Sequence, residues 1–115
     1  MKAPLALAAL LIVGTSTLAS AHDYATDMRK AQIDARRAEE RDRIQYGRRT
    51  GDLTLTEKWR LKNEQARIAQ MERDALRDGH ISRQEQYQIN RALNRASHNI
   101  YRERNDGNVA WWRRW

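Results

Sequence analysis

Apolar residues recur along this chain with the period of an α-helix, most clearly after Gly79. There they stand four, three and four positions apart on one face, at Ile89, Leu93, Ala96 and Ile100. The stretch after Gly51 has a similar face, made of Leu61, Ile68, Met71 and Ala75, with Leu76 beside it. These patterns predict two amphipathic helices of the coiled-coil type, whose stripes form the core together with Trp59 and Tyr87.

The two helical stretches are copies of one repeated unit. Gly51, Gly79 and Gly107 follow one another at intervals of 28 residues. Matching residues at equal offsets are Leu53 and Ile81, Thr54 and Ser82, Glu57 and Glu85, Trp59 and Tyr87, and Asp78 and Asp106. Short glycine turns between helices favour antiparallel neighbours. We therefore predict an all-α fold, either an elongated antiparallel helical hairpin or a three-helix bundle, with the two-helix repeat core at 51–106.

The segment 22–50 has the length of a third unit but a weaker apolar pattern. Its stripe consists of Tyr24, Met28, Ala31, Ala35 and Ala38, and both Ile33 and Ile44 lie off it. The run "RRAEERDR" at 36–43 is typical of a solvated helix face with ion pairs four residues apart. We expect a charged first helix that packs loosely.

The first 21 residues have the features of a secretory signal peptide. Lys2 precedes an apolar run from Leu5 to Val13, and the small residues Ala19 and Ala21 flank Ser20. The apolar run is shorter than a membrane-spanning helix, so we expect cleavage after Ala21. The chain has no cysteine, and export without disulfides is consistent with a periplasmic location.

The charge of the chain narrows the choice of partners. Lys and Arg number 22 against 15 Asp and Glu, a formal net charge of +7. Such an excess favours anionic partners, here unfolded or acidic protein clients and anionic lipid or lipopolysaccharide; nucleic acid is not expected among them. Because apolar residues are sparse in so short a chain, a homodimer could help to cover the core.

The turn sequences "TGDLTLTE" at 50–57 and "RDGHISRQE" at 77–85 have two interpretations. In the first they are helix-capping boxes preceded by left-handed glycines, formed by Gly51, Thr54 and Glu57 and by Gly79, Ser82 and Glu85. In the second, 74–85 is a partial EF-hand loop that binds Ca²⁺ through Asp74, Asp78, Ser82 and Glu85. Capping is favoured, because Leu76 replaces a ligand and Arg77 adds positive charge to the loop. No other cofactor is expected.

These motifs also carry a family resemblance. The strings Leu53-Thr54-x-x-Glu57 and Ile81-Ser82-x-x-Glu85 resemble the Leu-Thr-x-x-Gln motif of the Spy and CpxP group of periplasmic proteins, with glutamate in place of glutamine. The stretch 43–106, which includes "ASHNIY" at 96–101, is similar to uncharacterised proteobacterial secreted proteins with Gly-x-Leu-Thr-x-x-Glu repeats. The resemblance implies a small helical periplasmic protein and, from Spy, a chaperone or envelope-stress role.

The tail 107–115 has an unusual composition. Trp111, Trp112, Arg113, Arg114 and Trp115 combine indole and guanidinium groups, which suit a partner or a lipid interface; alternatively, the tryptophans cover the core or the tail is disordered.

No grouping of residues typical of catalysis is recognisable, so we expect no enzyme. The sequence predicts a binding protein, with three hypotheses for what it binds. These are a Spy-like chaperone, an EF-hand-like calcium-binding protein, and an envelope-associated structural protein that contacts anionic lipid through its tail.

Overall fold

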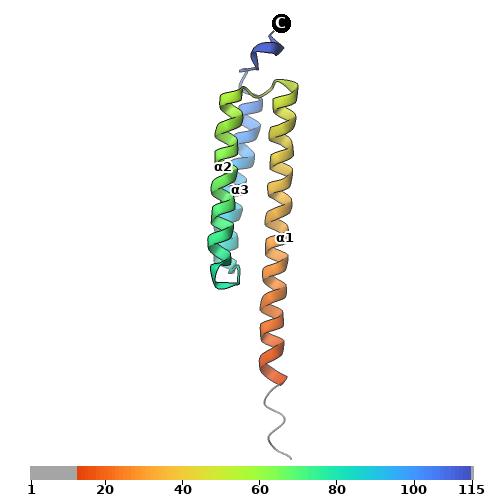
Figure 1. Cartoon of the computed structure of the whole chain (residues 1–115), viewed down its shortest axis with the longest axis vertical. Coiled ribbons are helices and arrows are strands. Elements are labelled where there is room, and N and C mark those ends of the chain that lie inside the picture. Colours follow the sequence, from red (N-terminus) through yellow and green to blue (C-terminus); the bar gives the residue numbers. More distant parts are fainter. Residues whose placement is uncertain (1–12, 115) are drawn as a thin grey trace, which may run out of the picture.

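The computed structural model describes residues 13–114, which form three helices and no strand (Figure 1). Helix α1 spans Val13–Thr50, α2 spans Leu55–Ala75 and α3 spans Arg83–Arg104. Two 3-10 turns, η1 at Leu76–Asp78 and η2 at Trp111–Arg113, follow α2 and α3. The helices pack against one another, with α2 antiparallel to α1 and α3. The predicted all-α fold is confirmed, and the architecture is the three-helix bundle.

The predicted capping boxes are both present. Thr54 precedes α2 and Ser82 precedes α3, and each hydroxyl accepts a hydrogen bond from the backbone N–H three residues later. Glu57 and Glu85 accept from the backbone N–H of these two residues in return, at 3.2 and 3.1 Å. Each box satisfies donors that a helix start otherwise leaves free, and loss of such a cap costs about 1 kcal/mol.

Glycines end the preceding helical segments, as the repeat suggested. Gly51, Gly79 and Gly107 have φ values of 82°, 86° and 83°. This left-handed conformation is open to glycine and costly for residues with a β-carbon. The 28-residue interval therefore marks the points where the chain leaves a helix.

The expectation that the first helix packs loosely is wrong. The side chains of Ile33 and Ile44 are fully buried, with 0% and 1% of their surface exposed, whereas Tyr24 and Met28 of the expected stripe are exposed. Side chains of α1 also reach α3: Arg43 donates to Ser97 Oγ at 2.7 Å and Arg36 to Asn94 Oδ1 at 2.7 Å. The face of α1 that packs on the other helices is therefore the face of Ile33 and Ile44, and not the predicted stripe that begins with Tyr24 and Met28.

Two apolar clusters fill the bundle. The larger consists of Ile33, Ile68, Ala75, Ile81, Ile89, Ala92, Leu93 and Ala96, and the smaller of Ile44, Leu53, Leu61 and Ile100. The buried side chains of Glu40 and Gln65 stand between them on α1 and α2, joined by a hydrogen bond of 2.9 Å from Gln65 Nε2 to Glu40 Oε1. Glu40 belongs to the run 36–43, so the prediction of a wholly solvated face is wrong at this residue.

The predicted signal peptide lies largely outside the described residues. Helix α1 begins at Val13 and continues through the predicted cleavage point after Ala21. Within the part of the chain that the structure describes, no helix is both long and apolar enough to cross a membrane.

Candidate functional site

The aromatic side chains lie outside the core. Every aromatic side chain that the structure describes is at least 41% exposed: Tyr24, Tyr46, Trp59, Tyr87, Tyr101, Trp111 and Trp112. The prediction that Trp59 and Tyr87 belong to the core is therefore wrong; 54% and 61% of their surfaces are exposed. Isoleucine, leucine and alanine fill the interior, and the aromatic rings are left for the surface.

Cationic side chains stand over several of these rings. The ammonium groups of Lys58 and Lys62 lie 5.5 and 5.7 Å from the centre of the Trp59 ring system. The guanidinium of Arg91 lies 5.8 Å from the Tyr87 ring, and that of Arg104 lies 5.1 Å from the Tyr46 ring. These distances are within the range of cation–π attraction, so cations and exposed rings share the same surface.

The C-terminal segment is docked on the turn between α1 and α2. The backbone N–H of Ala110 donates to the carbonyl of Gly51 at 2.9 Å, and Ala110 is only 3% exposed. Arg113 forms an ion pair with Asp52, which Arg104 also contacts at 3.3 Å. Burial alone would raise the pKa of Asp52, but hydrogen bonds from Thr50, Arg113 and Arg104 hold it below its usual value. Asp52 is thus an ionised anchor for the tail.

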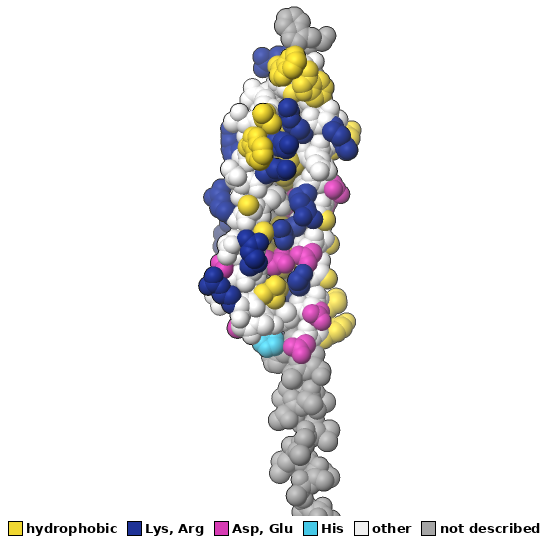
Figure 2. Space-filling model, in the orientation of Figure 1, with side chains coloured by type: hydrophobic (Ala, Val, Ile, Leu, Met, Phe, Trp, Pro, Cys, Tyr) yellow, Lys and Arg dark blue, Asp and Glu magenta, His cyan; other side chains and the backbone are white. Residues whose placement is uncertain are grey.

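Docking of the tail leaves its tryptophans in solvent. Trp111 is 74% exposed and Trp112 is 41% exposed, so neither covers the core. A surface cavity of about 330 Å³ beside them is lined by Arg48, Thr54, Leu55, Val109, Ala110, Trp111 and Arg114. Figure 2 shows hydrophobic and basic side chains gathered at this end of the bundle. We call this surface, formed by Arg48, Leu55, Val109, Trp111, Trp112, Arg113 and Arg114, the Trp/Arg tip. The side chain of Trp115 lies outside the described residues.

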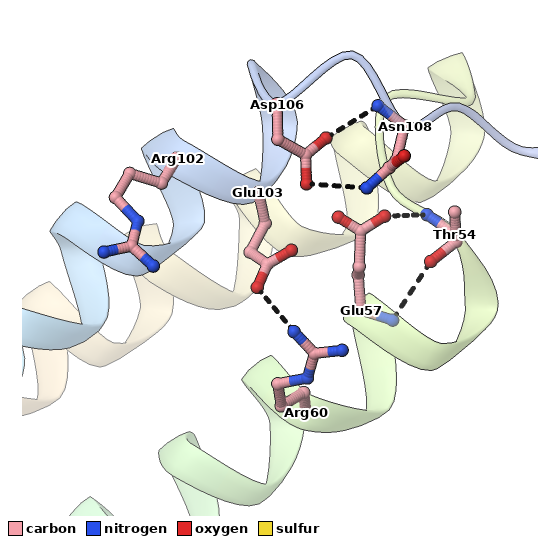
Figure 3. Close-up of a pocket in the computed structure, with 7 residues that line it drawn as sticks. All are labelled: Thr54, Glu57, Arg60, Arg102, Glu103, Asp106 and Asn108. Atoms are coloured by element: carbon pink, nitrogen blue, oxygen red, sulfur yellow. Dashed lines mark hydrogen bonds and ion pairs between the residues drawn. The ribbon is translucent and has the colours of Figure 1, made fainter.

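Three carboxylates meet at the same end of the bundle (Figure 3). Glu57 lies in the first turn of α2, Glu103 near the end of α3 and Asp106 in the turn that follows. One oxygen of each carboxylate lies within 4.8 Å of the others. Together with Thr54, Arg60, Arg102 and Asn108 they line a cavity of about 310 Å³. We call Glu57, Glu103 and Asp106 the acidic cluster.

The environment of Glu57 is unusual for a carboxylate. Its side chain is buried, Oε1 accepts from the Thr54 backbone N–H, and Oε2 has no hydrogen-bond donor. Burial, followed by the neighbouring carboxyls of Glu103 and Asp106, raises the pKa of Glu57 to about 7. Among the residues that the structure describes, this is the group of carboxylates arranged closely enough to share one ion.

The calcium loop predicted at 74–85 is not assembled. Asp74 accepts from Gln70 and pairs with Arg77 at 3.2 Å, and Asp78 accepts from the backbone N–H of His80. Ser82 and Glu85 are occupied in their capping box. The helix continues through Ala75 and then tightens into η1, so the backbone does not form a loop around a central ion. The structure therefore does not bring these four side chains together as a set of ligands, although Asp74 and Glu85 line one surface cavity.

The acidic cluster was missed because its members are far apart in sequence. In an antiparallel pair the start of α2 faces the end of α3, so Glu57 lies beside Glu103 and Asp106. The repeat contained a signal for this cluster, since Glu57 belongs to the opening motif of the first unit and Asp106 is the last residue of the second. Pairing these positions requires the helices to be known as antiparallel neighbours.

The fold and surface define a small, basic three-helix bundle with exposed aromatic residues. Comparison with known proteins adds no family to this description: no family model matches the chain, and neither curated proteins nor solved structures gave a significant match.

Proposed function

We propose that this is an exported, non-enzymatic binding protein that holds unfolded or anionic protein clients, in the manner of a Spy-like envelope-stress chaperone. The observation that carries the proposal is the exposure of every described aromatic side chain above an aliphatic core. Tyrosine and tryptophan normally bury much of their surface, so their consistent exposure favours contact with a partner.

The distribution of these rings favours flexible clients. They stand apart from one another on the three helices, with the adjacent pair Trp111 and Trp112 on η2, and several of them lie beneath lysine or arginine. An unfolded chain can contact such separated sites together, by stacking on rings and by pairing its carboxylates with guanidinium groups. The net charge of +7 attracts acidic segments at longer range.

Anionic lipid is a second candidate partner, favoured by the Trp/Arg tip. There Trp111 and Leu55 are exposed beside Arg48 and Arg114 on one end of the bundle. Indole at the head-group level and guanidinium on phosphate are typical of a membrane interface. This contact would use one end of the molecule, whereas client binding uses its length.

Two double variants separate these candidates. Trp59→Ala with Tyr87→Ala removes the equivalent rings of the two repeats. Trp111→Ala with Trp112→Ala removes the two indole rings of the Trp/Arg tip. All four side chains are exposed, so the bundle should remain folded. Each variant is tested for suppression of aggregation of a chemically denatured protein and for sedimentation with phosphatidylglycerol vesicles.

For a chaperone, loss of Trp59 and Tyr87 raises the concentration needed for half-maximal protection several-fold. Replacing Asn63 and Gln84, exposed polar residues on the same helices, with alanine is the matched control and leaves protection unchanged. Failure of the wild-type chain to protect at an equimolar ratio would contradict the chaperone proposal. Vesicle binding that is lost only with Trp111 and Trp112 would instead support the lipid interface.

A further inference from the structure

The acidic cluster contains a buried carboxylate oxygen that no hydrogen-bond donor of the described residues contacts. Glu57 is 4% exposed, and its Oε2 atom is buried without a hydrogen-bond donor. Figure 3 shows the carboxylates of Glu103 and Asp106 turned toward it, and these groups also carry acceptor oxygens. A buried carboxylate oxygen without a donor is unfavourable unless a proton or a positive ligand neutralises the group, and a divalent cation can neutralise Glu57 together with its two neighbours.

Nearby arginines do not supply that positive charge to Glu57. Arg60 pairs with Glu103 at 2.9 Å, and no other ion pair joins the cluster among residues 13–114. Arg102 lines the cavity, but Figure 3 places its guanidinium away from the three carboxylates. Arg60 therefore balances one of the three negative charges when all are ionised.

The atoms that the acidic cluster offers to an ion indicate which class of ion it can bind. The cluster offers carboxylate oxygens only, with no histidine or cysteine, and oxygen ligands favour hard cations such as Ca²⁺ over zinc or copper. One oxygen from each of the three residues lies within 4.8 Å of the others, so a single ion can contact all three after small side-chain movements. The cavity of about 310 Å³ leaves room for water molecules to complete the coordination.

We propose that Glu57, Glu103 and Asp106 form a binding site for a hard divalent cation, of the Ca²⁺ type, at the end of the bundle. The ion joins the start of α2 to the end of α3 and to the turn from which the docked tail departs. The site differs from the loop at 74–85 in every residue, and it does not depend on which partner the protein binds.

The two capping boxes provide a matched test. Glu57→Gln and Glu85→Gln make the same chemical change at equivalent repeat positions, and glutamine retains an oxygen that can accept from the N-cap backbone N–H. Only Glu57 belongs to the acidic cluster. Binding of CaCl₂ to the metal-free full chain is measured by calorimetry at about pH 8, where side-chain carboxylates are normally ionised.

We expect saturable binding of one ion with a dissociation constant on the order of 10⁻⁴–10⁻³ M, as in weak calcium modules. Glu57→Gln weakens it at least tenfold, and Glu85→Gln leaves it unchanged. If Glu57→Gln does not fold, as judged by circular dichroism, Asp106→Asn replaces it, because that side chain is exposed and lies outside the cap. No saturable heat at about 10 mM CaCl₂, well above that range, overturns the proposal; so does equal binding by the wild type and the cluster variant.

Discussion

At the scale of single residues, the pair of Glu40 and Gln65 shows how a polar group can occupy a helical core. Gln65 Nε2 donates to Glu40 Oε1, while Glu40 Oε2 and Gln65 Oε1 are both buried without a donor. A proton on Glu40 adds a donor to the pair, so the neutral acid suits this position better than the carboxylate. Burial raises the pKa of Glu40 accordingly, against the opposing effects of Gln65, Arg36 and Arg43.

This environment makes stability depend on pH through Glu40. A folded-state pKa above the ordinary value of 4.5 means that its stabilising contribution is complete below about pH 4.5 and is lost as pH rises through the folded pKa. Glu40→Gln replaces the carboxylate with a permanent donor. We expect the variant to raise the free energy of unfolding at neutral pH by about 1–3 kcal/mol, and to flatten this part of the pH dependence.

Urea unfolding between about pH 4 and 8 measures both effects. Glu39→Gln is the control, since it removes the same charge from the adjacent, exposed position. Equal changes in the two variants would show that net charge, rather than the buried pair, determines the response.

At the scale of the elements, the turn between α1 and α2 differs from its repeat counterpart. Gly51 and Gly79 have nearly the same φ, but a β-carbon on Gly51 would lie 2.8 Å from Cβ of Arg113, whereas Gly79 has nothing within 4 Å. The first glycine therefore serves two purposes: it turns the chain and lets the tail approach closely. The second serves only the turn.

Alanine at these two positions should separate the two purposes. Gly79→Ala is expected to cost roughly 1–2 kcal/mol from left-handed backbone strain alone, and Gly51→Ala should cost this and also displace the tail. Hydrogen exchange of the Ala110 amide, which donates to Gly51, reports docking. We expect faster exchange at Ala110 only in Gly51→Ala; unchanged protection there would contradict the role of Gly51 in docking.

At the scale of the whole molecule, the N-terminal part of α1 contacts the turn between α2 and α3 and so helps to hold the bundle together. Figure 1 shows α1 extending past the turn that joins α2 to α3. Near that turn, Thr26 Oγ1 accepts from the Ile81 backbone N–H at 3.2 Å, and Arg29 donates to the Ile81 carbonyl at 2.7 Å. These contacts lie on the C-terminal side of the predicted cleavage point after Ala21.

Two shortened chains test where the bundle begins. A chain that starts at His22 should keep the thermal midpoint of the full chain, because it retains Thr26 and Arg29. A chain that starts at Lys30 loses both hydrogen bonds, each worth about 0.5–1.5 kcal/mol, so its midpoint should fall by several degrees. Circular dichroism during heating gives both values, and a large fall for the His22 chain would place part of the stabilising contacts before the cleavage point.

The apolar pattern of the sequence identifies the packed face of α3 but not that of α1, for a physical reason. In α3 the core positions are aliphatic, so Ile89, Leu93, Ala96 and Ile100 show the packed face directly. In α1 the residues at positions 26, 33, 40 and 47 are buried at a seven-residue spacing, and Ile44 is buried between the last two. Of these five buried residues only Ile33 and Ile44 are large and apolar. Thr26, Glu40 and Gly47 are suited to this face by their hydrogen bonds or small size, which hydrophobic periodicity does not detect.

The sequence by itself determined the features that depend on neighbours along the chain. The capping boxes, the left-handed glycines and the stripe of α3 all arise within a few residues, where backbone geometry and local hydrogen bonds decide the outcome. Tertiary structure alone decided which face of α1 is buried, that the aromatic rings stay outside the core, and that Glu57 meets Glu103 and Asp106. These features depend on how each helix is rotated about its axis and aligned with its neighbours. Packing between the helices determines that rotation and alignment, so it cannot be read from neighbouring residues in the sequence.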